Sequence, residues 1–262
     1  MTSAMEAPAI VEPALTMPVD ELERVADTPC EIHVMLAQLH GCRAPMSSWR
    51  IHLVLVAALV AGCAGRSGHQ QLMQPDSADL QRRAPDVCHV RLETTKGPIV
   101  LEMRREWAPH GVDRFYNLLR AGYYDDTAIF RIRAGVWAQF GINGDPAVAQ
   151  RWRTRTIPDD PRLLSNVRGT VAFAFKSPNG RAAQVFINLR DNSAAHDVEP
   201  FVPFARIVEG MEVADALYAA YGERAGGGIR AGKQDPVFEG GNAYLRRDFP
   251  NLDYIKQATL VR

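Results

Sequence analysis

The chain has 262 residues, of which 47% are hydrophobic and 8% aromatic, so it can build a substantial buried core in one or two domains. It carries 30 Lys and Arg residues and 30 Asp and Glu residues, which gives a formal net charge of +0. This balance excludes an overall polybasic chain, and we expect no nucleic-acid partner.

The first part of the chain differs in composition from the rest. Residues 1–45 are rich in Ala, Pro and Glu and lack sustained periodicity, which predicts a disordered extension. They are followed by "MSSWRIHLVLVAALVAGCAGRS", where Arg50 supplies positive charge and an apolar segment too short to span a bilayer leads to "VAGC". This stretch resembles a bacterial lipoprotein signal. We therefore expect residues 46–62 to be a signal peptide and Cys63 to receive the lipid.

The lipoprotein interpretation requires translation to start at Met46, so that residues 1–45 are an upstream extension from a start placed too early. The alternative is a buried hydrophobic helix that ends in Gly-Cys by accident. The charged flank and the abrupt polar turn at "GRSGHQQ" favour the signal. It places the mature protein in the bacterial cell envelope, on the periplasmic side and lipid-anchored to a membrane.

Four cysteines, Cys30, Cys42, Cys63 and Cys88, show no metal-ligand spacing. We expect neither a metal site nor a disulfide framework, and interpret Cys88 as a small buried hydrophobic residue. Residues 63–86 are polar and interrupted by prolines, which predicts a flexible tether. The folded domain is expected to comprise residues 87–262.

The domain begins with a predicted hairpin, because two alternating apolar runs flank Lys96-Gly97. A helix follows, with Pro109 at its start and Gly122 after its last turn. Strands are expected in "AIFRIR", "VWAQFG", "GTVAFAF", "AQVFINL" and "FVPFARIVEG", before a short helix in "MEVADALYAAY". Many short strands with two clear helices indicate an antiparallel barrel or sandwich. "GERAGGGIRAG" lacks the flanking elements of a phosphate loop, and "IPDDP" indicates a turn.

Two of these strands combine apolar and polar faces. In "IFRIRAGVWAQFG", alternation places Phe130 and Ile132 on one face and Arg131 and Arg133 on the other. Taken alone, both arginines would be ordinary solvated groups on an amphipathic strand.

In "AQVFINL", Val185, Ile187 and Leu189 suit a barrel interior, whereas Gln184, Phe186 and Asn188 fall on the opposite face. Together with Arg131, Trp137 and Gln139, this second face predicts a groove with an apolar floor and a few polar donors.

Residues 88–262 resemble the cyclophilin-type peptidyl-prolyl isomerases, most plainly in "FRIRAGVWAQFGINGDP", "RGTVAFAF", "AQVFINL" and "PFVPFARIVEGMEVADALY". The resemblance implies a mainly β fold, a closed antiparallel barrel capped by two helices. It also implies an isomerase that needs no cofactor or metal and acts on proline-containing polypeptides. We expect a monomer.

Carried over position by position, the family's catalytic arginine is Arg131 and its substrate-orienting glutamine is Gln139. The phenylalanine of the proline pocket is Phe186, with Gln184 on the same face, and Ala174 is implied as a further substrate contact.

Other groove positions depart from the family pattern. Val136 and Trp137 stand where an aromatic residue and a methionine are usual, Phe175 replaces an asparagine, and Phe201 replaces a histidine. His196 lies near the position of the tryptophan associated with tight cyclosporin binding. These departures predict an altered substrate preference and weak cyclosporin binding.

Two functions fit this sequence. The first is an isomerase that speeds the folding of exported proteins by accelerating rotation about X-Pro bonds. The second is a catalytically weak, cyclophilin-like module or chaperone that binds proline segments with little turnover. The presence of both Arg131 and Gln139 favours the enzyme.

Overall fold

The computed structural model of the chain describes residues 68–226 and 233–261. The predictions for the extension at 1–45, the signal peptide at 46–62 and the lipidated Cys63 lie outside these residues. Within the described ranges, no helix is both long and apolar enough to cross a membrane.

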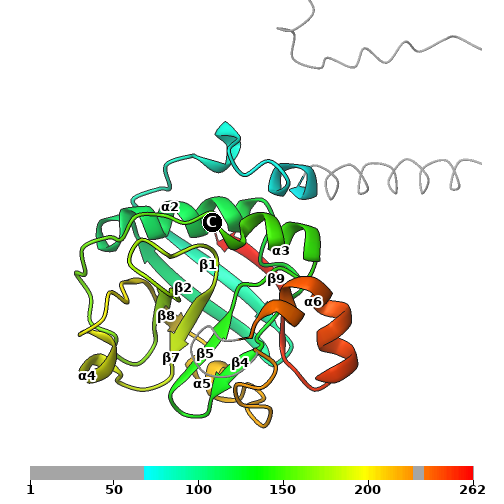
Figure 1. The fold of residues 1–262 in the computed structure, drawn as a ribbon. Coiled ribbons are helices and arrows are strands. Elements are labelled where there is room, and N and C mark those ends of the chain that lie inside the picture. The colour runs from blue at the N-terminus through cyan, green and yellow to red at the C-terminus, as the bar shows by residue number, and fades with distance from the viewer. Residues whose placement is uncertain (1–67, 227–232, 262) are drawn as a thin grey trace, which may run out of the picture. The chain divides into compact units, whose positions relative to one another are not determined.

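One antiparallel sheet organises the domain (Figure 1). Its nine strands are hydrogen-bonded in the order β3-β9-β1-β2-β8-β6-β7-β5-β4. The edge strands β3 and β4 are separated in the chain by only Ile129 and Phe130, so the sheet must curl back on itself to bring its two edges together. The predicted mainly β, antiparallel architecture is confirmed, although chain connectivity rather than a hydrogen-bonded ladder joins β3 to β4. The strands are β1 (Val87–Thr94), β2 (Gly97–Arg104), β3 (Thr127–Ala128), β4 (Arg131–Arg133), β5 (Trp137–Phe140), β6 (Thr170–Phe173), β7 (Val185–Asn188), β8 (Pro203–Glu209) and β9 (Tyr254–Val261).

Helices are more numerous than the two predicted. The predicted α2 (Pro109–Arg120) and α5 (Met211–Asp215) are present, and α2 has proline in its first turn and Gly122 at φ +74° beyond its end. The sequence did not reveal α3 (Pro146–Arg153), α4 (Ser193–His196) and α6 (Asp235–Asp248). Gly241 interrupts α6 at φ +52°, which breaks its helical periodicity. Residues 68–72 are also helical, and the described residues include two short 3-10 helices, η2 (Ala78–Leu80) and η3 (Arg105–Trp107).

The core confirms one predicted alternation and corrects another. Val185, Ile187 and Leu189 are all buried in the main hydrophobic cluster, as expected for the interior face of β7 and its extension. Phe130 and Ile132, however, belong to different buried clusters. The reason is that regular pairing begins only at Arg131, so residues 129 and 130 do not continue the alternation of β4.

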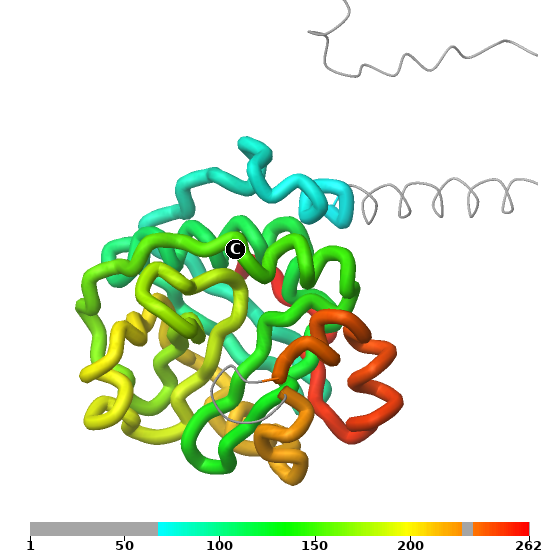
Figure 2. Tube along the Cα trace, viewed as in Figure 1, coloured from blue at the N-terminus to red at the C-terminus, as the bar shows by residue number. Residues whose placement is uncertain are grey.

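Residues 68–86 are packed on the domain, which corrects the flexible tether predicted for 63–86. Leu72, Leu80 and Ala84 are buried in the main cluster. The indole Nε1 of Trp152 donates to the Leu72 carbonyl at 2.8 Å. Figure 2 shows this segment running over the helices that follow β2. Because its contacts use backbone groups as well as apolar side chains, the polar composition did not predict its order.

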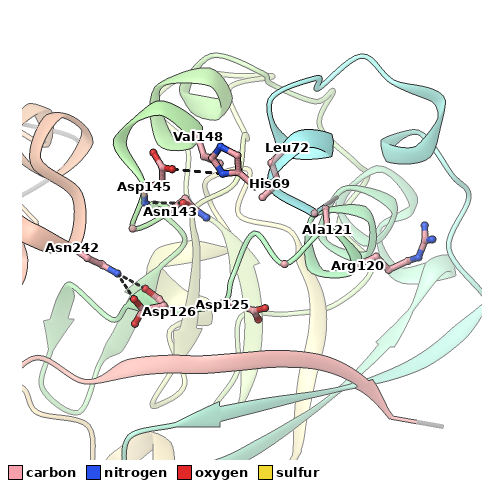
Figure 3. A pocket seen from close by; sticks show the side chains of 13 residues that line it. His69, Leu72, Arg120, Ala121, Asp125, Asp126, Asn143, Asp145, Val148 and Asn242 are labelled. Atoms are coloured by element: carbon pink, nitrogen blue, oxygen red, sulfur yellow. Dashed lines mark hydrogen bonds and ion pairs between the residues drawn. The ribbon is translucent and has the colours of Figure 1, made fainter. Parts of the chain in front are cut away.

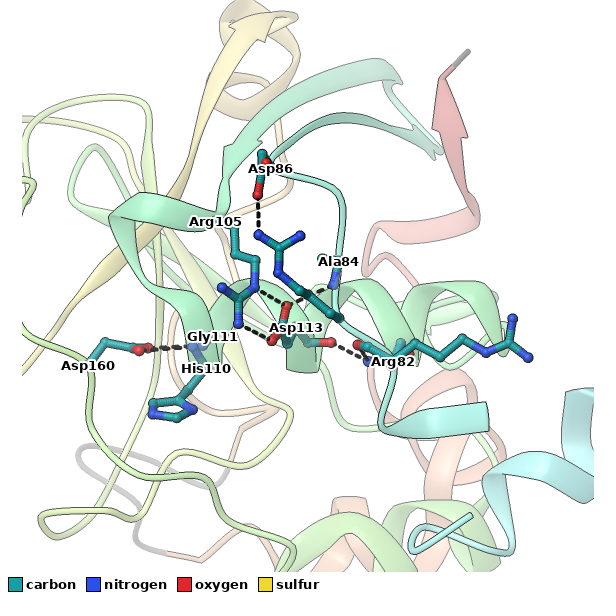
Figure 4. A network of polar contacts seen from close by, with 10 residues as sticks. Arg82, Ala84, Asp86, Arg105, His110, Gly111, Asp113 and Asp160 are labelled. Carbon is teal, nitrogen blue, oxygen red and sulfur yellow. Dashed lines mark hydrogen bonds and ion pairs between the residues drawn. The ribbon is translucent and has the colours of Figure 1, made fainter. Parts of the chain in front are cut away.

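Two contacts tie the end of this segment to α2. The Asn117 amide donates to the Arg82 carbonyl at 2.7 Å, and the Ala84 backbone N–H donates to Asp113 Oδ1 at 2.9 Å. Arg105 forms a bidentate pair with the same Asp113 carboxylate, at 2.9 Å for both bonds (Figure 4).

The "IPDDP" acids do more than form a turn. The Asp160 carboxylate accepts bonds from the backbone N–H groups of His110 and Gly111, both at 2.9 Å, at the beginning of α2 (Figure 4). It also pairs with the fully buried Arg181 at 3.1 Å, while Asp159 pairs with Arg181 at 3.0 Å. A carboxylate at a helix N-terminus satisfies free N–H groups and complements the helix dipole. Asp160 therefore fastens this loop to α2.

Candidate active site

A groove of about 950 Å³ lies where β4, β5 and β7 meet α4 and α6. The substrate-site residues implied by the family resemblance line it with the exception of Val136. Those that line it are Arg131, Trp137, Gln139, Ala174, Phe175, Gln184, Phe186, His196 and Phe201. Asn188, which alternation placed on the same face as Gln184 and Phe186, is buried and does not line it either.

Arg131 is a buried groove residue, although alternation placed it on an outward face. Only 8% of the residue is exposed. It is the cross-strand partner of Gln139, and its NH1 group donates to Gln139 Oε1 at 3.0 Å. Its guanidinium carbon also lies 4.7 Å from the centre of the Trp137 ring, in cation–π contact. The family resemblance assigns chemistry only to Arg131 and implies that Arg133 is a solvated neighbour beyond the groove; Arg133 is exposed but lines the same groove.

A chain of side-chain amides orients Gln139. Its Nε2 group donates to Gln184 Oε1 at 2.7 Å, which leaves Oε1 to accept from Arg131. The Gln184 and Gln234 amides bond to each other in both directions, at 3.0 and 3.2 Å. Gln234 immediately precedes α6 and supports Gln184, which in turn accepts from Gln139, the residue that contacts the groove arginine.

Aromatic rings form the apolar floor. Phe186 packs edge-on against Phe201 and His196, with ring centres 5.3 Å apart in each case. Phe201 also lies 4.5 Å from Phe175. Phe186 is only 5% exposed because these neighbours come from two other segments and cover the face that alternation had left open.

Val136, predicted as a substrate contact, is not among the residues that line the groove. It lies in the turn between β4 and β5, after Gly135 at φ +65°. Its carbonyl accepts bonds from the Leu189 backbone N–H at 2.9 Å and from the Asn192 amide at 2.8 Å. Val136 therefore links this turn to the segment after β7.

The family model described as "Cyclophilin type peptidyl-prolyl cis-trans isomerase/CLD" matches residues 89–231. The chain belongs to this family. Peptidyl-prolyl cis-trans isomerase B of Escherichia coli (strain K12) is 30% identical over 158 residues, covering 57% of this chain and 96% of that protein.

Two further relatives show similar identity. Isomerase cyp18 of Streptomyces antibioticus is 32% identical over 136 residues, covering 49% of this chain and 81% of that protein. Isomerase A of Dickeya dadantii (strain 3937) is 31% identical over 142 residues, covering 53% of this chain and 75% of that protein.

This cyclophilin is a peptidyl-prolyl cis-trans isomerase, and the groove has the parts that such a reaction requires. Rotation about an X-Pro bond faces a barrier of roughly 20 kcal/mol because resonance gives that bond partial double-bond character. Rotation forms no covalent bond to the enzyme, so hydrogen-bond donors and a shaped apolar surface suffice. Among the described residues, the buried Nε of Arg131 has no hydrogen-bond partner.

Sequence reasoning missed several residues that line the groove of this cyclophilin, among them Glu223, Gln234 and Phe238. Glu223 lies in the glycine-rich stretch "GERAGGGIRAG", which lacks the pattern of a phosphate loop and predicts no other site. The other two residues belong to the region of α6. Their proximity to Arg131 and Gln184 depends on the tertiary fold, so no local pattern could have revealed it.

A second cavity, of about 730 Å³, lies between residues 68–72, the end of α2, the start of α3 and α6 (Figure 3). Two of its acidic side chains have polar partners. Asp145 lies 3.6 Å from His69, and Asp126 accepts from Asn242 at 2.9 Å and pairs with Arg246 at 2.6 Å. Within the described residues, no cluster of three His, Cys, Asp or Glu side chains could hold a metal ion.

Proposed function

We propose that this isomerase assists the folding of exported proteins in the bacterial cell envelope, with Arg131 as its catalytic residue and a lipid on Cys63 as its membrane anchor. The assignment of catalysis to Arg131 depends on one observation. A buried guanidinium is held in the groove by Gln139 and still presents an unpartnered donor.

In this mechanism, Arg131 stabilises the twisted amide. As the X-Pro bond rotates, the lone pair of the prolyl nitrogen localises and becomes a better hydrogen-bond acceptor. A guanidinium that donates to this nitrogen and to the prolyl carbonyl therefore binds the transition state more strongly than the planar ground state. Gln139 helps to orient both the arginine and the peptide.

The aromatic floor would hold the proline ring while the rest of the peptide turns. Phe186, Phe201 and His196 form an apolar wall, and Trp137 borders it beside Arg131. Fixing one side of the bond in this way lowers the entropy that must be lost on reaching the transition state. The substrates are proline-containing segments of unfolded or flexible polypeptides, and we propose that a monomer acts on them.

The proposal for this site is tested by protease-coupled isomerisation of an Xaa-Pro tetrapeptide with the purified full-length chain. We expect the rate to increase in proportion to enzyme concentration. Titration calorimetry with the same peptide separates the two functions that fit the sequence. Measurable peptide binding without any acceleration would support the binding module and contradict the catalytic assignment.

The envelope location is proposed from the sequence "VAGC" after a short apolar segment. Mass spectrometry of the protein from its native membranes should show a lipid-modified Cys63 at the N-terminus. Cys63→Ser should release the protein from the membrane fraction. A mature protein that retains Met1 would contradict the anchor.

A further inference from the structure

We propose that Glu223 is a positioning residue that holds the guanidinium of Arg131 in its catalytic orientation. This inference deepens the proposed function, because it depends on Arg131 being the catalytic residue. Glu223 does not match any part of the motifs on which the family resemblance was based.

The contact between the two side chains is direct and largely shielded from solvent. Glu223 Oε2 lies 3.3 Å from Arg131 NH2, and the two side chains are 20% and 9% exposed. Glu223 Oε2 is buried and forms no hydrogen bond with any other described group. Its pairing with Arg131 is therefore the only polar contact that the structure gives to this oxygen.

The loop that carries Glu223 is docked on β4. The backbone N–H of Ile132, the residue after Arg131, donates to the Gly222 carbonyl at 3.0 Å. A Cβ atom on Gly226 would lie 2.9 Å from Arg131 Cβ, so only glycine lets the backbone approach the arginine so closely. Tyr221 packs against Phe249, with ring centres 5.2 Å apart. Glu223 therefore projects from a fixed backbone.

Three contacts together define the position of the guanidinium plane. Gln139 holds NH1, Glu223 holds NH2, and the Trp137 ring lies against the guanidinium. Anchoring both terminal nitrogens limits rotation of the group, while Nε remains without a partner. Orienting a donor before the substrate binds removes an entropic cost from the reaction.

The geometry also argues against direct substrate binding by Glu223. Its buried oxygen Oε2 is directed at Arg131, and a carboxylate cannot bond to a peptide carbonyl, which is itself an acceptor. A peptide N–H is a donor that a carboxylate accepts, so the Arg131→Ala/Glu223→Gln double variant distinguishes action through the arginine from direct contact with the peptide.

The test compares steady-state isomerisation by the full-length wild type with Glu223→Gln, Glu223→Ala, Arg131→Ala and the Arg131→Ala/Glu223→Gln double variant. Glu212→Gln serves as the matched control, because Glu212 is an exposed acid on α5 that does not line the groove. We expect Glu223→Gln to lower kcat about fivefold with little change in KM, because the ion pair with Arg131 becomes a weaker contact between the guanidinium and a neutral amide. Glu223→Ala should lose more activity, and Glu212→Gln should match the wild type.

The decisive outcome is the behaviour of the double variant. If Glu223 acts through Arg131, Glu223→Gln should cause no further loss once Arg131 is removed. An equal further loss would overturn the inference, as would wild-type kcat or a raised kcat in both Glu223 variants. Glu223→Gln is nearly isosteric, so it remains informative if Glu223→Ala fails to fold. Full activity of Arg131→Ala would instead refute the catalytic assignment on which this inference depends.

Discussion

Replacing Arg131 with alanine should separate catalysis from stability. The substitution removes the bond to Gln139, the ion pair with Glu223 and the contact with Trp137. A charge-assisted bond made mainly in the transition state is worth about 3 kcal/mol, and each 1.36 kcal/mol corresponds to roughly a tenfold change in rate. The catalytic efficiency kcat/KM should therefore fall by a factor on the order of 100 or more.

The same substitution should destabilise the fold, because Arg131 is buried rather than solvated on an outward face. Glu223 would keep a largely buried carboxylate without its cation, and Gln139 would lose a donor. We expect the free energy of unfolding to fall by about 1–3 kcal/mol, which is smaller than the roughly 5–15 kcal/mol typical of a folded domain. The variant should therefore remain folded at assay temperature.

Arg133→Ala is the matched control, because Arg133 lies on the same short strand and is exposed at the edge of the groove. Its unfolding free energy should change by less than about 0.5 kcal/mol, and its activity should stay within about twofold of wild type. Protease-coupled rates and urea denaturation of both variants provide the comparison. Equal activity losses, or a loss in Arg131→Ala that matches its unfolded fraction, would refute the assignment.

Three further predictions concern the fold and the groove. Asp160→Asn should lower the unfolding free energy by about 1–3 kcal/mol in urea, because it weakens the capping of α2 and the pair with buried Arg181; an unchanged midpoint would contradict this. Cyclosporin should bind far more weakly than to family members with a groove tryptophan, and nanomolar affinity by calorimetry would show that another residue, such as Trp137, replaces that indole. Burial raises the pKa of Cys88 to about 11, so less of the reactive thiolate is present at neutral pH in the folded chain. Peptide mapping should show slower alkylation of Cys88 in the folded chain than in the urea-unfolded chain, and equal rates would refute this. The contribution of the protonated Cys88 thiol to the free energy of unfolding is present below the pKa of the unfolded thiol and is lost as the pH rises toward about 11.

The parts of the site that could be predicted from the sequence are those encoded in short local runs. Arg131 and Gln139 lie eight residues apart on adjacent strands, and Phe186 lies in a strand whose alternation is regular. Period-two patterns therefore located these side chains, and the family resemblance gave them roles. Alternation could not show that Arg131 and Phe186 are buried, because the groups that cover them come from other segments.

The remaining features depend on contacts that leave little trace in the sequence. Gln184 and Gln234 meet across 50 residues, and Glu223 reaches Arg131 from a glycine-rich loop. The mostly polar side chains of residues 68–86 predict a tether. Yet two of their tertiary bonds use the carbonyls of Leu72 and Arg82, groups that every residue possesses.

The docking of residues 68–86 also sets a mechanical limit on an anchored enzyme. Only four residues lie between Cys63 and Gly68, so even a fully extended connection spans no more than about 17 Å. A lipid on Cys63 would therefore keep the catalytic domain close to the membrane and raise its effective concentration near the membrane surface. Such an enzyme would act on polypeptides as they emerge from the bilayer rather than on polypeptides that diffuse freely away from the membrane.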